Sequence, residues 1–263
     1  MNQVANDLNG TDDILFGSLS VEDRTTIENF KLSFISYFEI PKERIPNVFD
    51  FSTRQSLLIT WSNFINQIAL RNINFIRQVN EFEHLCLNDR IILTKYNIFP
   101  ILPISKCYNY KHKYICPFDS REEEENHQRI FSSLGLADHI GDAFINVVIS
   151  FVHVTGQDLT LLSLLLIILF FTPGLSMSEN QPPLTDPLAV HRAQSHYTKI
   201  LWSYLVDQYG DVGACRRFSE LLSLILRMQS GTKDYQMFFR DQCSALNIVE
   251  QITPLMQTVL NIS

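Results

Sequence analysis

The chain has 263 residues, of which 46% are hydrophobic and 19% charged, and its formal net charge is −7. This length suits one large domain or two small ones, and the absence of a Gly/Ser/Pro-rich linker between two halves favours a single core. A net negative chain lacks the basic surface that nonspecific nucleic-acid binding needs, so we expect no direct nucleic-acid contact.

The five cysteines are scattered along the chain and form no C-x-x-C pair. Their pattern predicts neither a structural zinc site nor a disulfide scaffold, and we expect no metal ion and no cofactor. A reducing, intracellular setting is the simplest interpretation. The start of the chain is polar and acidic, unlike a secretory signal. We expect residues 1–18 to form a flexible tail and residues 19–263 to form the domain.

Nearly every long segment predicts a helix. The first spans residues 19–38, where Ser20 and Asp23 form a weak capping-box pattern ahead of apolar side chains at helical spacing. A second, long helix fits residues 56–79. Its few polar positions indicate that it runs through the middle of the domain.

A third helix is predicted over residues 87–106, with Asn88 as a possible cap. Pro100 and Pro103 are expected to kink or break it, because a proline inside a helix removes a backbone hydrogen bond. Residues 108–118 are rich in β-prone side chains and predict a small hairpin.

The most apolar run of the chain is "LTLLSLLLIILFF", thirteen residues long. A membrane span needs about 20 residues, so we predict a buried central helix and no membrane contact. A Pro-rich stretch over 172–187 predicts a loop. The helices predicted in this half of the chain span 137–154, 158–171, 186–209 and 212–242.

Two stripes of side chains follow the last of these helices at helical spacing. The stripe expected to face the core holds Phe218, Leu221, Ile225 and Met228. The adjacent stripe holds Ser219, Leu222, Ser223 and Leu226. Exposed leucines would be a liability on a monomer. The alternative is that both stripes are buried.

The chain closes with "TPLMQTVL", residues 253–260. Thr253 can cap a helix and Pro254 suits its first turn. Four apolar side chains share one side of that helix, those of Leu255, Met256, Val259 and Leu260. Two turns of helix are not stable alone. We therefore expect this segment to dock on the domain, with little free energy separating its docked and undocked states.

The segment "NFIRQVNEFEHLCLNDRIILTK", residues 74–95, resembles the signature of nuclear receptor ligand-binding domains. Further segments resemble the first, ninth, tenth and terminal activation helices of that family, in the same order. The Pro-Leu-Met-Gln sequence of the terminal segment is similar to that of the vitamin D and pregnane X receptor group. The signature residues that match are Phe75, Ile76, Arg77, Phe82, Leu85, Asp89, Arg90, Leu93, Thr94 and Lys95.

The resemblance implies an all-α fold, a three-layer antiparallel sandwich of about twelve helices with a small β-hairpin. It also implies action in the nucleus, a buried pocket for a lipophilic ligand, and a retinoid X receptor-like dimer partner. Many relatives carry an arginine at the position of Ser105. Here that charge is missing unless the neighbouring Lys106 reaches in, so a neutral ligand, sterol-like or xenobiotic, is favoured over an acid. The implied pocket residues are Phe64, Ile65, Ile68, Asn72, Phe99, Leu102, Ser105, Lys106, Phe118 and Met256.

The same resemblance implies a groove for coactivator or corepressor peptides and a dimerisation surface. In the groove, cations face the negative end of a Leu-x-x-Leu-Leu peptide helix. The family carries a glutamate where this chain has Thr258, which brings no charge. The implied groove residues are Ile73, Arg77, Ile91, Lys95, Leu255 and Thr258, and the implied dimer residues are Ser219, Leu222, Ser223 and Leu226.

Two other classes of function compete with a ligand-driven receptor. An enzyme is not expected, because the sequence lacks the common hydrolase, metalloprotease, phosphate-loop and dinucleotide motifs. A ligand-independent scaffold or corepressor-like protein would share the receptor fold but have a filled pocket.

Overall fold

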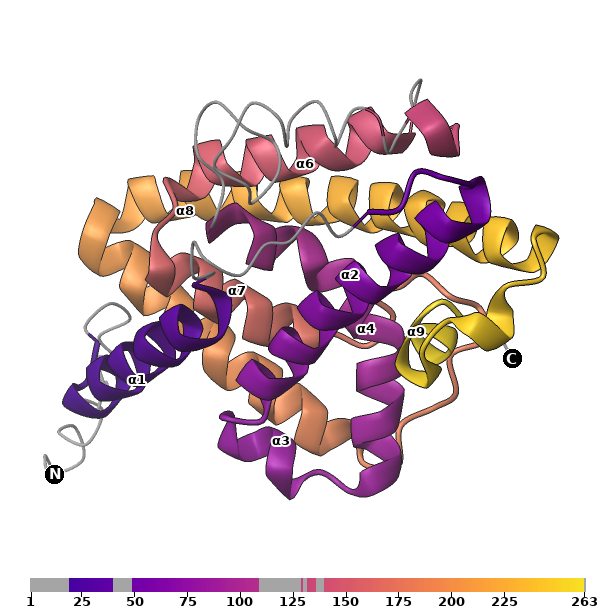
Figure 1. Ribbon diagram of the computed structural model, residues 1–263. Helices are drawn as coiled ribbons and strands as arrows, with labels where there is room; N and C mark the ends of the chain where they lie inside the picture. Colours follow the sequence, from indigo (N-terminus) through magenta and orange to yellow (C-terminus); the bar gives the residue numbers. More distant parts are fainter. Residues whose placement is uncertain (1–18, 40–48, 109–128, 130–131, 136–139, 263) are drawn as a thin grey trace, which may run out of the picture.

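The structure is a computed structural model that describes residues 19–39, 49–108, 129, 132–135 and 140–262. Within this part the chain is helical and no strand is present (Figure 1). The elements are α1 (Val21–Phe38), α2 (Arg54–Ile76), α3 (Asn80–His84), α4 (Leu87–Tyr108), α6 (Ile140–Thr155), α7 (Leu159–Phe170), α8 (Pro187–Ala245), η1 (Val249–Gln251) and α9 (Pro254–Val259).

The all-α prediction is confirmed, but two of its details are not supported. The described residues hold nine helical elements rather than about twelve. The hairpin predicted over 108–118 is not seen, because Tyr108 ends α4 and residues 109–118 lie outside the described residues. The tail predicted over 1–18 lies outside them as well.

The prediction of a buried central helix is confirmed by α7. Every residue of this helix after the first is buried. It packs against α1, α4 and α8, so neighbouring helices cover it on several sides (Figure 1). Among the described helices, none is both long and apolar enough to cross a membrane.

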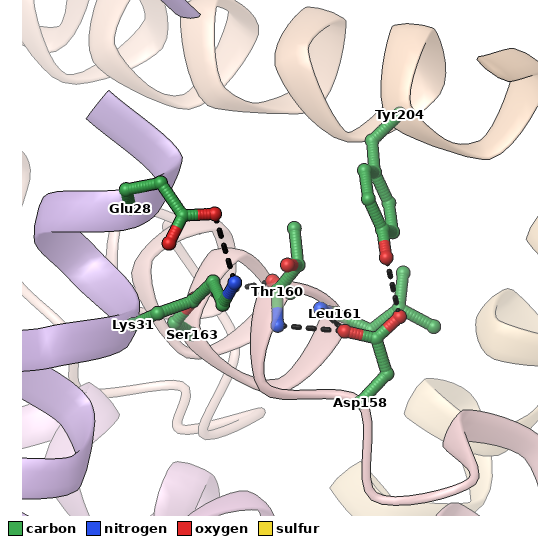
Figure 2. Close-up of polar contacts among 7 residues, drawn as sticks. All are labelled: Glu28, Lys31, Asp158, Thr160, Leu161, Ser163 and Tyr204. Carbon is green, nitrogen blue, oxygen red and sulfur yellow. Dashed lines mark hydrogen bonds and ion pairs between the residues drawn. The ribbon is translucent and has the colours of Figure 1, made fainter. Parts of the chain in front are cut away.

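Asp158 fixes the start of α7 and ties it to α8. Its Oδ1 accepts hydrogen bonds from the backbone N–H of Thr160 at 2.8 Å and of Leu161 at 3.4 Å. Its Oδ2 accepts a hydrogen bond from the hydroxyl of Tyr204 on α8 at 2.6 Å. Figure 2 shows the carboxylate between the two helices. Burial, together with this carboxylate, raises the pKa of Tyr204. The phenol therefore stays protonated and remains a donor.

The two helices predicted over 186–209 and 212–242 are the two arms of α8. Gly210 separates them with φ 65° and ψ 173°, a conformation outside the helical region. Glycine adopts positive φ without the steric cost of a Cβ atom. The arms run in different directions (Figure 1), and α8 thereby contacts both α6 and α7.

The predicted break at the prolines of α4 is wrong. The helix continues from Leu87 to Tyr108 through Pro100 and Pro103. All residues from 96 to 105 are buried, and we attribute the continuity to this packing, which offsets a cost of about 3 kcal/mol per proline. Asn88 is not the cap, since it lies inside the helix and its Nδ2 donates to Thr185 Oγ1 at 3.0 Å.

The capping box predicted at the beginning of the domain is confirmed. Ser20 Oγ accepts a hydrogen bond from the backbone N–H of Asp23 at 3.0 Å. In return, Asp23 Oδ2 accepts a hydrogen bond from the backbone N–H of Ser20 at 3.2 Å. The long helix predicted to reach residue 79 instead ends at Ile76, and the short α3 that follows was not predicted.

Candidate functional site

The terminal helix α9 is docked on α2 and α4. Thr253 is its N-cap, as predicted, and accepts the backbone N–H of Met256 at 3.4 Å. The same hydroxyl donates to Asn66 Oδ1 of α2 at 2.8 Å. Met256 and Val259 are both 0% exposed. The helix is therefore attached by a polar contact at its start and by buried apolar side chains along its length.

Two glutamines connect α9 to its neighbours. Gln257 Nε2 donates to the carbonyls of Val249 at 2.8 Å and Ile252 at 3.1 Å. Gln236 of α8 donates through Nε2 to the carbonyl of Val259. These bonds link η1, α9 and the second arm of α8, so the end of α9 is held directly by α8.

The residues implied for the ligand pocket come from helices that meet in the interior. The buried members are Ile65, Asn72, Phe99, Leu102, Ser105 and Met256. Phe64, Ile68 and Lys106 are half-buried, and Phe118 lies outside the described residues. Whether these residues bind a ligand stays a prediction.

A buried polar pair lies within this set. Asn72 Nδ2 donates to Ser105 Oγ at 3.2 Å and to the Ile68 carbonyl at 2.9 Å. Ser105 Oγ in turn donates to the Leu102 carbonyl at 3.0 Å. Asn72 Oδ1 is buried and has no hydrogen-bond partner among the described residues. An unsatisfied buried acceptor costs about 1–3 kcal/mol, so this oxygen is a candidate contact for a donor group.

Lys106 reaches the aromatic rings of this region. Its Nζ lies 5.0 Å from the ring centroid of Phe144 and 6.0 Å from that of Phe64. A cation at this distance is attracted by the negative face of a ring. The lysine is thereby held by an aromatic pair from α2 and α6.

Sequence reasoning missed a cluster of aromatic rings beside the implied pocket. The rings of Trp61 and Phe239 are parallel, with centroids 3.4 Å apart. Tyr235 stacks on Phe144 at 4.7 Å and lies 6.1 Å from Phe99. The spacing of Tyr235 and Phe239, one helical turn apart, was a signal that could have found part of this cluster.

The residues implied for the coregulator groove lie on elements that contact one another, α2, α4 and α9. Ile91 is 53% exposed, and Ile73 and Leu255 are half-buried. Partly exposed apolar side chains on three adjoining helices fit the floor of a peptide groove.

The two implied cations of the groove differ in their surroundings. Arg77 Nε is 3.2 Å from Glu83 Oε1, an exposed ion pair of small energy. Lys95 Nζ lies 5.5 Å from the Tyr96 ring centroid. Thr258 is exposed and its hydroxyl donates to the Pro254 carbonyl at 2.8 Å. This end of α9 therefore carries an acceptor oxygen but no negative charge.

Comparison with protein families finds a match over residues 58–238 to the ligand-binding domain of nuclear hormone receptors. That match covers more than half of the chain, and it includes α3, α4, α6, α7 and most of α2 and α8. The chain belongs to this family. No curated protein matched the chain.

Within the nuclear receptor domain, Asp89 of the signature segment anchors the start of α8. It is 0% exposed. Its oxygens accept the backbone N–H groups of Thr185 at 2.6 Å and Asp186 at 2.8 Å. Burial by itself raises the pKa of Asp89, but these hydrogen bonds outweigh it and hold the pKa below its ordinary value. Asp89 is thus a structural carboxylate that joins two helices distant in sequence.

The implied dimer residues of the receptor domain are exposed. Leu222 is 48% and Leu226 68% exposed, and the two serines beside them are exposed as well. Leu221 and Met228 of the core stripe are buried. The alternative that both stripes are buried is therefore wrong, while dimerisation itself stays a prediction.

The described part of the receptor domain holds no group of three or more His, Cys, Asp or Glu side chains that could bind a metal ion.

Proposed function

We propose that the chain is a nuclear, ligand-controlled regulator of transcription, which binds a neutral lipophilic molecule and recruits coregulator peptides through α9. The observation that carries this proposal is the position of α9. This short helix has Met256 at 0% exposure in the interior and Thr258 exposed at its surface. A ligand that contacts Met256 favours the docked helix by its differential affinity for that state.

The ligand in this proposal is a neutral alcohol, sterol-like or xenobiotic. Asn72 Oδ1 lacks a donor among the described residues, and Ser105 offers a hydroxyl rather than a charge. A ligand hydroxyl would satisfy the amide oxygen. A carboxylate would find no cation at Ser105 itself, and the ammonium of the neighbouring Lys106 lies near the rings of Phe64 and Phe144. The Pro-Leu-Met-Gln segment supports a place near the vitamin D and pregnane X receptor group, and the three-layer, twelve-helix arrangement belongs to the same proposal.

Native mass spectrometry of the purified protein tests the proposal first. A reproducible small-molecule adduct that is lost on denaturation supports a working pocket and gives the mass of the ligand. A protein that stays bare after exposure to a library of lipids and sterols would contradict it.

Asn72→Leu is expected to weaken binding of a sterol alcohol about fivefold, because the variant loses a hydrogen bond of about 1 kcal/mol. Binding of the matching hydrocarbon, which has no hydroxyl, should not weaken. Titration of both compounds into wild type and variant measures the difference. Equal losses for the two compounds would indicate a change of shape rather than a lost hydrogen bond.

Thr258→Glu is expected to tighten binding of a Leu-x-x-Leu-Leu peptide about tenfold. The carboxylate would cap the positive N-terminus of the peptide helix, and charge-assisted hydrogen bonds are about twice as strong as neutral ones. Fluorescence polarisation of a labelled peptide measures the affinity. Thr258→Gln is the neutral control, and an equal gain from both variants would exclude the charge as the cause.

Leu226→Glu is expected to abolish pairing with a retinoid X receptor-like partner through the exposed stripe of α8. Burying an unpaired carboxylate in an apolar interface is costly. Sedimentation velocity of mixtures with the partner domain measures the complex. Leu32→Glu is a matched control on α1, where the leucine is 65% exposed. Unchanged pairing of the Leu226 variant would place the interface elsewhere.

The aromatic cluster favours a second candidate, a ligand-independent scaffold. Trp61, Phe99, Phe144, Tyr235 and Phe239 come from the helices that enclose the implied pocket, and their rings lie against one another. Peptide titration separates the two candidates once a ligand is in hand. A receptor gains peptide affinity on loading, whereas a scaffold does not.

A further inference from the structure

A cavity of about 300 Å³ opens at the surface where three segments meet. Its walls come from the loop between α7 and α8, the second arm of α8, and the residues that follow α9. None of the residues implied for the ligand pocket lines it. The cavity therefore shares no lining residue with the implied ligand pocket.

The cavity combines an apolar wall with cationic groups. Met177 and Met237 line it and are 47% and 41% exposed, and the buried Leu260 lines it as well. Lys233, Met237 and Arg240 of α8 all line the cavity, as their helical spacing allows.

The polar groups of the cavity have few competing partners. Ser176 is 6% exposed, and its Oγ has no hydrogen-bond partner among the described residues. Across that same part of the chain no carboxylate pairs with Lys233. Arg240 Nε pairs with Asp241 at 3.2 Å, but both side chains are exposed and such pairs contribute little. One carboxylate, Glu179, also lines the cavity.

We propose that this cavity binds a small amphipathic carboxylate, such as a medium-chain fatty acid. The carboxylate would lie between Lys233 and Arg240 and accept a hydrogen bond from the buried hydroxyl of Ser176. The alkyl chain would cover Met177, Met237 and Leu260. We favour a carboxylate over a neutral lipid because the lining carries two cationic side chains and one acidic side chain. The site goes beyond the function proposed above and does not depend on it.

Occupancy of this cavity should also stabilise the docked terminal helix. Gln236 lines the cavity and holds the Val259 carbonyl at the end of α9. Leu260 and Asn261, the residues directly after α9, form part of the wall. Undocking of α9 would remove this part of the wall, so we expect an occupant to favour the docked state.

Methionine methyl NMR tests the site with octanoate as the probe. The chain has five methionines, of which Met177 and Met237 line the cavity, Met256 is the buried methionine of α9, and Met228 is a buried control. We expect octanoate to shift the Met177 and Met237 signals saturably, and to leave Met228 unchanged. Octan-1-ol and octylammonium, with the same chain, should bind at least tenfold more weakly.

Variants of the charged residues make the test specific. Lys233→Gln together with Arg240→Gln should weaken octanoate at least tenfold, and Glu179→Gln should tighten it. Equal binding of octanoate and octan-1-ol, or no shift at Met177 and Met237, would overturn the proposal. A shift confined to Met256 would place octanoate in the interior and would overturn it as well. Failure here leaves the peptide and sterol experiments unaffected.

Discussion

Replacing Asp89 with alanine is expected to lower the free energy of unfolding by about 3 kcal/mol, since hydrogen bonds to a charged group contribute about 1.5–3 kcal/mol each. The carboxylate is fully buried and accepts two backbone N–H groups at the start of α8. Alanine leaves both donors without a partner and removes the link between α4 and α8. Urea unfolding followed by circular dichroism measures the change.

The contribution of Asp89 should also depend on pH in a defined direction. Its pKa in the folded chain is lowered, because the backbone hydrogen bonds outweigh the effect of burial. A lowered pKa means that stability is present above the unfolded value of about 4. It is lost as the pH falls through the lower, folded value.

Asp89→Asn is the informative comparison for this experiment. The amide keeps the shape and one acceptor oxygen but has no titratable proton. We expect an intermediate loss of stability, with the acid-dependent part removed. The anchoring role would be contradicted if the alanine variant were as stable as wild type at pH 7. It would also be contradicted if the asparagine variant lost as much stability as wild type when the pH is lowered.

Met256→Ala is expected to detach α9 while the rest of the domain stays folded. A buried methionine truncated to alanine costs about 2–5 kcal/mol, and a six-residue helix cannot be stable alone. The cost therefore falls on docking rather than on global unfolding. With about 3 kcal/mol lost, hydrogen-exchange protection near Leu260 should fall about a hundredfold. The amide of Leu260 is bonded to the Met256 carbonyl at 2.9 Å and reports the docked state directly.

Peptide binding gives the functional readout of the same variant. If α9 completes the coregulator groove, a Leu-x-x-Leu-Leu peptide should bind Met256→Ala at least tenfold more weakly. Leu32→Ala is the control, because it truncates an apolar side chain on α1 where it is 65% exposed. Its stability and peptide affinity should stay close to wild type. Unchanged exchange near Leu260 in the Met256 variant would show that docking does not depend on this contact.

Local sequence patterns were sufficient wherever a structure depends on near neighbours. The capping box of Ser20 and Asp23 and the cap at Thr253 involve residues three positions apart, and both were predicted. The division of α8 at Gly210 was anticipated within two residues, because glycine tolerates the positive φ that the turn requires. The exposed stripe that includes Leu226 was separated from the core stripe by helical period alone.

Sequence patterns gave a wrong prediction where tertiary packing outweighed the local conformational preference of a residue. Pro100 and Pro103 predict an interruption, yet α4 continues through both. The penalty of a proline is local, whereas the compensating contacts come from helices distant in sequence. Burial of residues 96–105 on all sides therefore decides the outcome.

By itself the sequence determined the helical class, the order of the helices and the family resemblance, because these follow from periodicity, caps and a contiguous signature. Only the tertiary structure decided which side chains meet. The Asn72–Ser105 pair spans two helices, and Asp89 reaches the backbone of Thr185, 96 positions further along the chain. The cavity beside Lys233 likewise needs three separate segments. Contacts between distant segments depend on how whole helices pack, and no local pattern encodes that packing.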